Sequence, residues 1–264
     1  MNLFVMLGYI VAINWFCLTV VWLVSVKIRD ASIIDIYWGI GFIVMAWACL
    51  LINPVHNPTS VSISQWLIIF MVTIWGFRLS LHLAIRNLGK GEDYRYVAMR
   101  KRSVLNFRIF SYFRIFMFQG LLQIIVITPI LAMHYYPQEL GFGFFNYLGL
   151  ALWGIGFAYE ILADVQLVNF RSNPINQNAV LNSGLWRYSR HPNYFGDALQ
   201  WWAFFIFSLQ TGHYWGIIGP IIMMFIFLRL TIKLLEFPQT KKRPDYEEYV
   251  NTTNVFFPGP KKNQ

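Results

Sequence analysis

The sequence predicts an all-α protein: an integral membrane bundle of about seven transmembrane helices, with the N-terminus outside and the C-terminus in the cytoplasm. Of its 264 residues, 57% are hydrophobic and only 12% are charged, whereas about 25% are charged in an ordinary soluble domain. The apolar residues fall in blocks of about 20, the length that crosses a bilayer. Among the connecting loops, lysine and arginine occur only in alternate ones, which indicates a fixed orientation.

Seven apolar blocks are predicted to span the membrane, in the order 3–26, 33–52, 61–84, 109–133, 145–170, 194–212 and 214–236. The first block lacks a basic leading region and is too long for a signal peptide, so we expect it to be retained. The sixth and seventh blocks are separated only by the short stretch TGHYWG.

The loops between these blocks differ sharply in charge. The N-terminal segment, the loops 53–60 and 134–144 and the turn around 213 contain no lysine or arginine. The opposite side receives the loop 86–108 with seven lysines and arginines, the loop 171–193 and the C-terminal tail. By the positive-inside rule this second side is cytoplasmic. The net charge of +9 is explained by these loops facing anionic membrane lipid, so we expect no nucleic-acid partner.

Ionisable residues inside the spans are candidates for function, because a bilayer makes them costly. They include Asp35, Arg78, His82, Glu160, Asp164, Asp197 and Glu236. By the predicted topology all lie toward the cytoplasmic half, which indicates a polar cavity open to the cytoplasm rather than a channel. A structural role remains open for several, since Asp35 can pair with a neighbouring span and long basic side chains can snorkel. Cys17 and Cys49 show no disulfide or metal spacing, so no metal site is expected.

The stretch LWRYSRHPNYFGD, residues 185–197, has the composition of an anion site. Arg187 and Arg190 have guanidinium groups that suit phosphate oxygens. Pro192 is typical of a first helical turn, and a helix starting there directs its free N–H groups toward the same place. Asn193 and Asp197 add partners for a carboxamide or ribose hydroxyls. The stretch therefore predicts a receptor for a phosphorylated aromatic ligand such as a dinucleotide, with a lipid-facing basic patch as the alternative.

Neither GxGxxG nor a Walker sequence is present, so Rossmann and P-loop binding do not apply. Arg171 follows Asp164 by seven residues and shares its helix face.

We expect the chain to form one membrane domain, 1–264. The first three spans and their basic loop lie in 1–108, and a cofactor-binding half with a short tail lies in 109–264. A short helix is expected near 245–251.

Together with ADVQLVNFR, RPDYEEYVNTTNVFFP, DIYWG, WGFRLSLHL and GEDYRY, this stretch resembles the bacterial membrane proteins grouped with the steroid 5α-reductases. Its RHPNYFGD core is also similar to the sterol C14 and C24 reductases and lamin B receptor. A looser version, RHPxYxG with a late glutamate, is found in isoprenylcysteine carboxyl methyltransferases and phospholipid N-methyltransferases. The resemblance implies a bacterial inner-membrane protein that uses NADPH to reduce a C=C bond, of the enone type, in a lipophilic steroid-like or isoprenoid-like substrate taken from the bilayer.

The resemblance also implies roles for particular residues. The NADPH contacts it implies are Asp164, Arg171, Arg187, Arg190, His191, Asn193, Tyr194 and Asp197, with Glu236, Tyr246 and Tyr249 closing over the nucleotide. Candidates for substrate binding and proton donation are Asp35, Tyr37, His82 and Glu236. The Gln-Glu pair and tyrosine with which steroid 5α-reductases hold their substrate have no clear counterpart, so the sequence does not name the substrate.

Two alternatives stay open. One is an S-adenosylmethionine-dependent methyltransferase on the same scaffold, which would need fewer arginines because its cofactor carries no phosphate. The other is a non-enzymatic lipid-binding or scaffold protein, which would bind neither cofactor. The oligomeric state is not indicated by the sequence.

Overall fold

The computed structural model describes residues 2–56, 61–104, 106–136, 141–176, 179–243 and 245–262. Every regular element within these ranges is a helix, as predicted. The chain is an integral membrane protein, with six described helical segments long and apolar enough to cross a bilayer: Leu3–Ile28, Ile33–Ile52, Ile63–Asn87, Phe107–Val126, Phe144–Ser172 and Trp215–Phe237. The predicted loops 53–60 and 134–144 lie partly outside the described residues, and the predicted orientation stays a prediction.

The predicted sixth span is the helix α9, Pro192–Ser208. With 17 residues it measures about 25 Å, somewhat less than a bilayer core of about 30 Å. Three of its large side chains, Trp201, Phe204 and Phe207, are fully buried. A helix surrounded by protein does not need to match the thickness of the bilayer core. We infer that α9 is enclosed mainly by protein rather than by lipid.

The chain packs as two compact units. Unit 1 comprises Met1–Gly143 with Ser208–Ile218, and unit 2 comprises Phe144–Phe207 with Gly219–Gln264. Each unit is described by itself below. The predicted separation of a cofactor-binding half after residue 108 stays a prediction.

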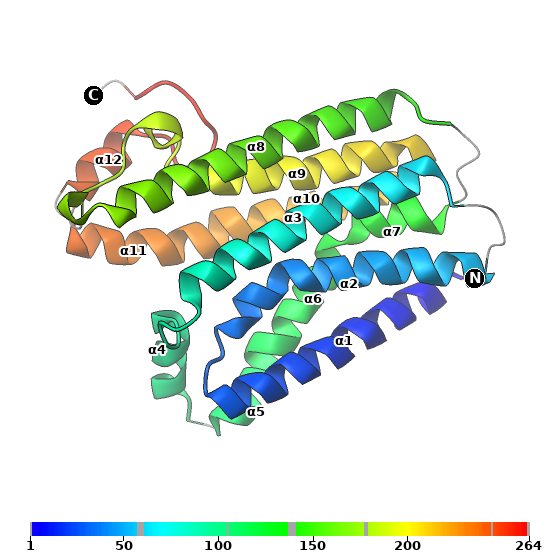
Figure 1. Cartoon of the computed structure of the whole chain (residues 1–264), viewed down its shortest axis with the longest axis horizontal. Helices are drawn as coiled ribbons and strands as arrows, with labels where there is room; N and C mark the ends of the chain where they lie inside the picture. The colour runs from blue at the N-terminus through cyan, green and yellow to red at the C-terminus, as the bar shows by residue number, and fades with distance from the viewer. Residues whose placement is uncertain are drawn as a thin grey trace. The chain divides into compact units, whose positions relative to one another are not determined.

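Three long helices of unit 1 lie side by side, α1 (Leu3–Ile28), α2 (Ile33–His56) and α3 (Ile63–Asn87) (Figure 1). Gly39 and Gly76 meet where α2 crosses α3, and a Cβ on Gly76 would lie 2.7 Å from the Gly39 carbonyl oxygen. Small residues of this kind let membrane helices approach closely. The short helix α4 (Tyr94–Arg102) follows on the basic loop, with Asp93 as its N-cap.

The predicted fourth span, 109–133, is not one continuous α-helix. It is built from α5 (Phe107–Ser111), the π-helical turn η1 (Tyr112–Met117), α6 (Phe118–Val126) and α7 (Thr128–Tyr135). Pro129 lies in the first turn of α7, where its missing N–H is tolerated but where the preceding helix cannot continue unbroken.

Unit 2 is built around α8 (Phe144–Ser172) and α9, which lie side by side (Figure 1). A Cβ on Gly156 would lie 2.7 Å from the Gly196 carbonyl oxygen, and one on Gly196 would lie 2.6 Å from the Glu160 nitrogen. The last span continues through α10 (Ile218–Phe225), the π-helical turn η6 (Ile226–Thr231) and α11 (Ile232–Lys242). The helix expected near 245–251 is confirmed as α12 (Tyr246–Thr252).

Candidate functional site

The turn η3 (Gly184–Arg187) lies against α8. The Trp186 indole donates a hydrogen bond to the Ala163 carbonyl at 3.0 Å, and the Leu185 amide donates to the Gln166 side chain at 2.9 Å. Gly184 has a φ of +58°, which side chains other than glycine rarely adopt. This docking brings the segment before Arg187 against the stretch of α8 that carries Asp164, while the Arg187 side chain itself stays exposed.

A buried polar group lies where α9 begins. Asn193 donates from Nδ2 to Asp164 Oδ1 at 3.1 Å, which links the first turn of α9 to α8. Asp164 and Asp197 are only 6% and 5% exposed. The Asn193 Oδ1 atom is buried and accepts no hydrogen bond from any residue that the structure describes. Since such an acceptor is costly when left unmade, it is a ready partner for an amide or hydroxyl donor of a ligand.

Arg190 connects the start of α9 with α11 and the C-terminal tail. Its guanidinium donates to Glu236 Oε1 at 2.7 Å and Oε2 at 3.2 Å, to the Val250 carbonyl at 2.9 Å and to the Thr253 carbonyl at 2.8 Å. The side chain is 7% exposed. The predicted phosphate contact at Arg190 stays a prediction, but in this arrangement most of its donors already serve the protein itself.

His191 and Tyr194 belong to the same cluster. His191 Nε2 lies 2.9 Å from Glu236 Oε1, and the Tyr194 ring stacks between His191 at 5.7 Å and Phe227 at 4.9 Å. Glu236 therefore serves Arg190 and His191 as a hydrogen-bond acceptor. The predicted role of Glu236 as a proton donor stays a prediction, and it would require this cluster to rearrange.

Tyr246 and Tyr249 lie on the inner face of α12. The Tyr249 hydroxyl donates to the Trp186 carbonyl at 2.6 Å, so it fastens α12 to η3. Burial and the nearby charge of Glu236 raise the pKa of Tyr246 to about 12. Burial likewise raises the pKa of Tyr249 well above its usual range, so both phenols keep their protons at neutral pH.

The predicted residues Asp35, Tyr37 and His82 belong to unit 1. Asp35 accepts hydrogen bonds from Arg95 Nη2 at 2.7 Å and from the Tyr96 hydroxyl at 2.6 Å. Burial and the charge of Asp35 raise the pKa of Tyr96 well above its usual range. Asp35 is thus held as an acceptor by the loop helix α4 and not, as the structural alternative above had it, by a neighbouring span.

Tyr37 is 8% exposed and belongs to a mostly apolar cluster with Leu18, Ile34 and Phe116. The same cluster contains Tyr96, whose hydroxyl donates to Asp35. His82 is half-buried on α3. The partners of Asp35 on α4 were not singled out as site residues from the sequence, although GEDYRY, which contains Arg95 and Tyr96, was among the motifs that carried the resemblance.

The structure therefore gathers most of the predicted cofactor residues within unit 2, in two linked groups. One group is the Asp164–Asn193 pair, with Asp197 buried one turn further along α9, and the other is the Arg190–His191–Glu236 cluster with its tyrosines. Arg171 and Arg187 are exposed. Among the described residues, no group of three or more histidines, cysteines or carboxylates is placed to hold a metal ion.

Comparisons with known proteins assign a family but not an activity. The chain is 27% identical over 264 residues to an "Uncharacterized protein C594.04c" of Schizosaccharomyces pombe, covering 90% of this chain and 76% of the yeast protein. No solved structure matches it significantly. Residues 21–253, which include every candidate site residue named above, match the family described as "Protein of unknown function (DUF1295)", and the chain belongs to this family.

Proposed function

We propose that the chain is a membrane-embedded, NADPH-dependent reductase of a C=C bond in a lipophilic substrate. The observation that carries the proposal is the pairing of buried Asp164 with half-buried Asn193, whose buried Oδ1 atom has no donor among the described residues. This pair adjoins the junction of η3 with α8, and that junction exposes Arg187. Buried hydrogen-bonding groups next to exposed guanidinium groups suit a ligand with polar and phosphate parts.

The residues of unit 2 fit NADPH as follows. Arg187 and Arg171 are exposed and would hold phosphate oxygens. Asn193, Asp164 and Asp197 would pair with the carboxamide or the ribose hydroxyls. NADPH, when bound, supplies a hydride.

An enone that takes up a hydride develops negative charge on its carbonyl oxygen, and a hydrogen-bond donor there stabilises the transition state. Asp35 and Glu236 both accept hydrogen bonds from arginines. A tyrosine is therefore the better candidate for the donor. A phenol keeps its proton at neutral pH, and burial and the charge of Glu236 raise the pKa of Tyr246 further, to about 12.

The membrane setting completes the proposal. The alternation of basic loops favours a cytoplasmic C-terminus, so unit 2 would take its cofactor from the cytoplasm of a bacterium. The substrate, steroid-like or isoprenoid-like in its lipophilicity, would arrive through the bilayer.

One observation favours an S-adenosylmethionine-dependent methyltransferase as the second candidate. Arg190 is engaged by Glu236 and two backbone carbonyls. Its engagement leaves Arg171 and Arg187 as the exposed arginines of the site. S-adenosylmethionine carries no phosphate, so its binding would not require the guanidinium of Arg190 in addition to those of Arg171 and Arg187.

Kinetics of the purified protein test the proposal. We expect NADPH oxidation in the presence of lipophilic enones, and we expect Arg187→Ala to raise the KM for NADPH about tenfold or more with a smaller change in kcat, since it removes a charged hydrogen bond. Arg229→Ala, an exposed arginine of η6, is the matched control. An equal loss in kcat at saturating NADPH would contradict the role of Arg187, and inactivity with every enone would contradict the reaction.

A further inference from the structure

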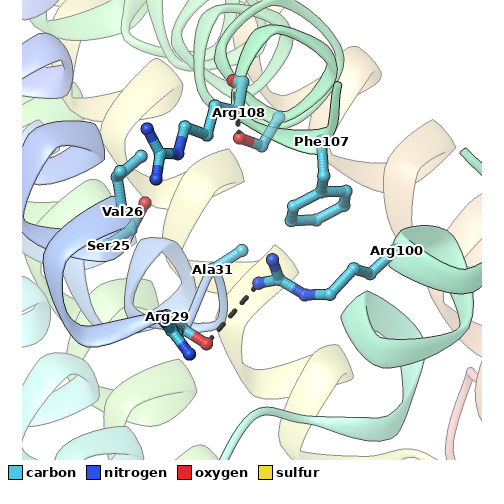
Figure 2. Close-up of a pocket in the computed structure, with 8 residues that line it drawn as sticks. Ser25, Val26, Arg29, Ala31, Arg100, Phe107 and Arg108 are labelled. Atoms are coloured by element: carbon cyan, nitrogen blue, oxygen red, sulfur yellow. Dashed lines mark hydrogen bonds between the residues drawn. The ribbon is translucent and has the colours of Figure 1, made fainter. Parts of the chain in front are cut away.

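A cavity of about 230 Å³ lies in unit 1, between the end of α1 and the end of the basic loop. Its three charged lining residues are all arginines: Arg29, Arg100 and Arg108. Ser25, Ala31 and Phe107 complete much of the wall (Figure 2). This cavity is far along the chain from the residues assigned above to NADPH, and it shares none of them.

Arg100 forms a fixed, neutralised part of the wall. It donates to Glu92 from Nη2 at 2.7 Å and from Nε at 3.0 Å, and its guanidinium lies 3.9 Å from the centre of the Phe107 ring. Glu92 is held in turn by the Ala31 amide at 2.9 Å. Arg100 also donates to the Arg29 carbonyl at 3.5 Å, as Figure 2 shows. The charge of Arg100 is thus balanced by Glu92 and shapes the cavity.

The positive charges of the other two lining arginines, Arg108 and Arg29, are not balanced in this way. Within the described parts of the chain, no carboxylate lies within ion-pair distance of either guanidinium. The backbone of Arg108 is fixed, because its carbonyl accepts from the Trp22 indole at 3.2 Å and from the Ser111 hydroxyl at 2.9 Å. Arg29 ends α1 in the left-handed conformation, with a φ of 59°, at a position where glycine is usual.

The elements that carry these two arginines also carry exposed apolar side chains. On α1, Val24 is 46% and Ile28 is 52% exposed, one helical turn apart. On α5 and η1, Ile109 is 57% and Phe113 is 62% exposed, again one turn apart. Since α1 is a candidate membrane span that ends at Ile28, the cavity lies at the level where a lipid phosphate meets its acyl chains.

We propose that this cavity binds the phosphate group of a phosphate ester, with Arg108 and Arg29 as the cationic partners. Two unbalanced guanidinium groups match the charge of a phosphate, and their planar donors suit its oxygens. The chemistry is shared by a glycerophospholipid headgroup and by a soluble phosphate ester. The flanking apolar residues point to the headgroup as the source.

Ligand titrations of the full-length protein in detergent test this proposal. Phosphatidic acid with short acyl chains, glycerol 3-phosphate and the matching diacylglycerol would be added separately, with thermal unfolding as the readout. We expect stabilisation by phosphatidic acid and none by diacylglycerol. Arg108→Gln and Arg29→Gln should each weaken the response to phosphatidic acid about tenfold or more. Arg102→Gln, an exposed arginine at the end of α4 that does not line the cavity, should leave it unchanged.

The outcomes distinguish the two sources and the failure of the proposal. An arginine-dependent response to phosphatidic acid alone assigns the site to a lipid headgroup, and an equal response to glycerol 3-phosphate assigns it to the phosphate ester itself. An equal response to diacylglycerol, or an equal loss in Arg102→Gln, would overturn the proposal. Phenylglyoxal labelling of the unmutated protein gives an independent check, because phosphatidic acid should protect Arg108 but not Arg102.

Discussion

Replacing Arg190 by glutamine should release the C-terminal segment 245–262 from the rest of unit 2. The guanidinium donates two hydrogen bonds to the Glu236 carboxylate and two to the backbone carbonyls of Val250 and Thr253. A glutamine is shorter and uncharged, so it leaves the carboxylate without its ion-pair partner. The tail would then be held mainly by Tyr249, by the Ser189 hydroxyl, which donates to the Phe256 carbonyl at 2.7 Å, and by backbone hydrogen bonds to residues 188 and 190.

The size of the effect follows from burial. Removing one partner of a buried ion pair costs about 3–5 kcal/mol. Arg190 is 7% exposed but Glu236 is 18% exposed, so its carboxylate can recover some hydration. We therefore expect the lower end, about 3 kcal/mol. Since 1.4 kcal/mol is a factor of ten, the equilibrium for tail opening should rise about 100-fold.

Hydrogen exchange of the protein in detergent measures this opening. The amides to follow are those that bond between the tail and the segment before α9: Gly259 donates to the Tyr188 carbonyl at 3.2 Å, and the Arg190 amide, which the substitution keeps, donates to the Asn254 carbonyl at 2.8 Å. Their exchange should quicken about 100-fold, because exchange from a locally open state follows the opening equilibrium. Arg190→Lys keeps the charge but not the planar fork, so it should give an intermediate rate.

Arg187→Gln is the control, since that side chain is exposed three residues away. Unchanged tail exchange in Arg190→Gln, together with a loss of NADPH binding, would refute the structural role. It would show instead that Arg190 serves the cofactor, as the family resemblance implied.

Two further predictions concern packing and pH. Gly196→Val should lower the thermal unfolding midpoint by several degrees, because its Cβ would lie 2.6 Å from the backbone of α8. Gly154→Val is the control and should leave the midpoint unchanged, because a Cβ there has nothing within 4 Å. Equal midpoints for the two variants would contradict the close approach of α8 and α9. Burial alone would raise the pKa of Asp93, but hydrogen bonds from Arg95 and its charge hold it below the usual value. A lowered folded pKa contributes stability above the unfolded value of about 3.9 and loses it as the pH falls through the folded value. In Asp93→Asn the free energy of unfolding should therefore fall less steeply as the pH drops below about 4. The same pH dependence in the variant and the unmutated protein would argue against this role of Asp93.

The helical architecture was largely predictable because a bilayer demands long apolar segments whose ends are marked by polar residues. The first span was expected at 3–26 and is Leu3–Ile28. The fourth was expected to be continuous, but it is broken at a π-helical turn and again before Pro129. Hydropathy averages over such breaks, because most residues around them are apolar even though Arg114 lies in the π-helical turn itself.

The candidate site was predictable as a cluster but not in its pairing. The motif brought Arg187, Arg190 and His191 together, and it marked the start of α9 at Pro192. It could not indicate that Arg190 faces the tail, because two of its acceptors are backbone carbonyls 60 and 63 residues away. Backbone acceptors leave no signature in the side-chain sequence. The partners of Asp35 were missed for a related reason, since Arg95 lies 60 residues further along the chain.

Cofactor binding by the purified protein tests the proposed function most directly. NADPH, NADH and S-adenosylmethionine would be titrated separately, with thermal unfolding as the readout, into the unmutated protein and into Arg187→Ala. Selective stabilisation by NADPH that is weakened in Arg187→Ala is the predicted result. Stabilisation by S-adenosylmethionine instead, or no response to any of the three, would contradict the assignment to NADPH-dependent reduction.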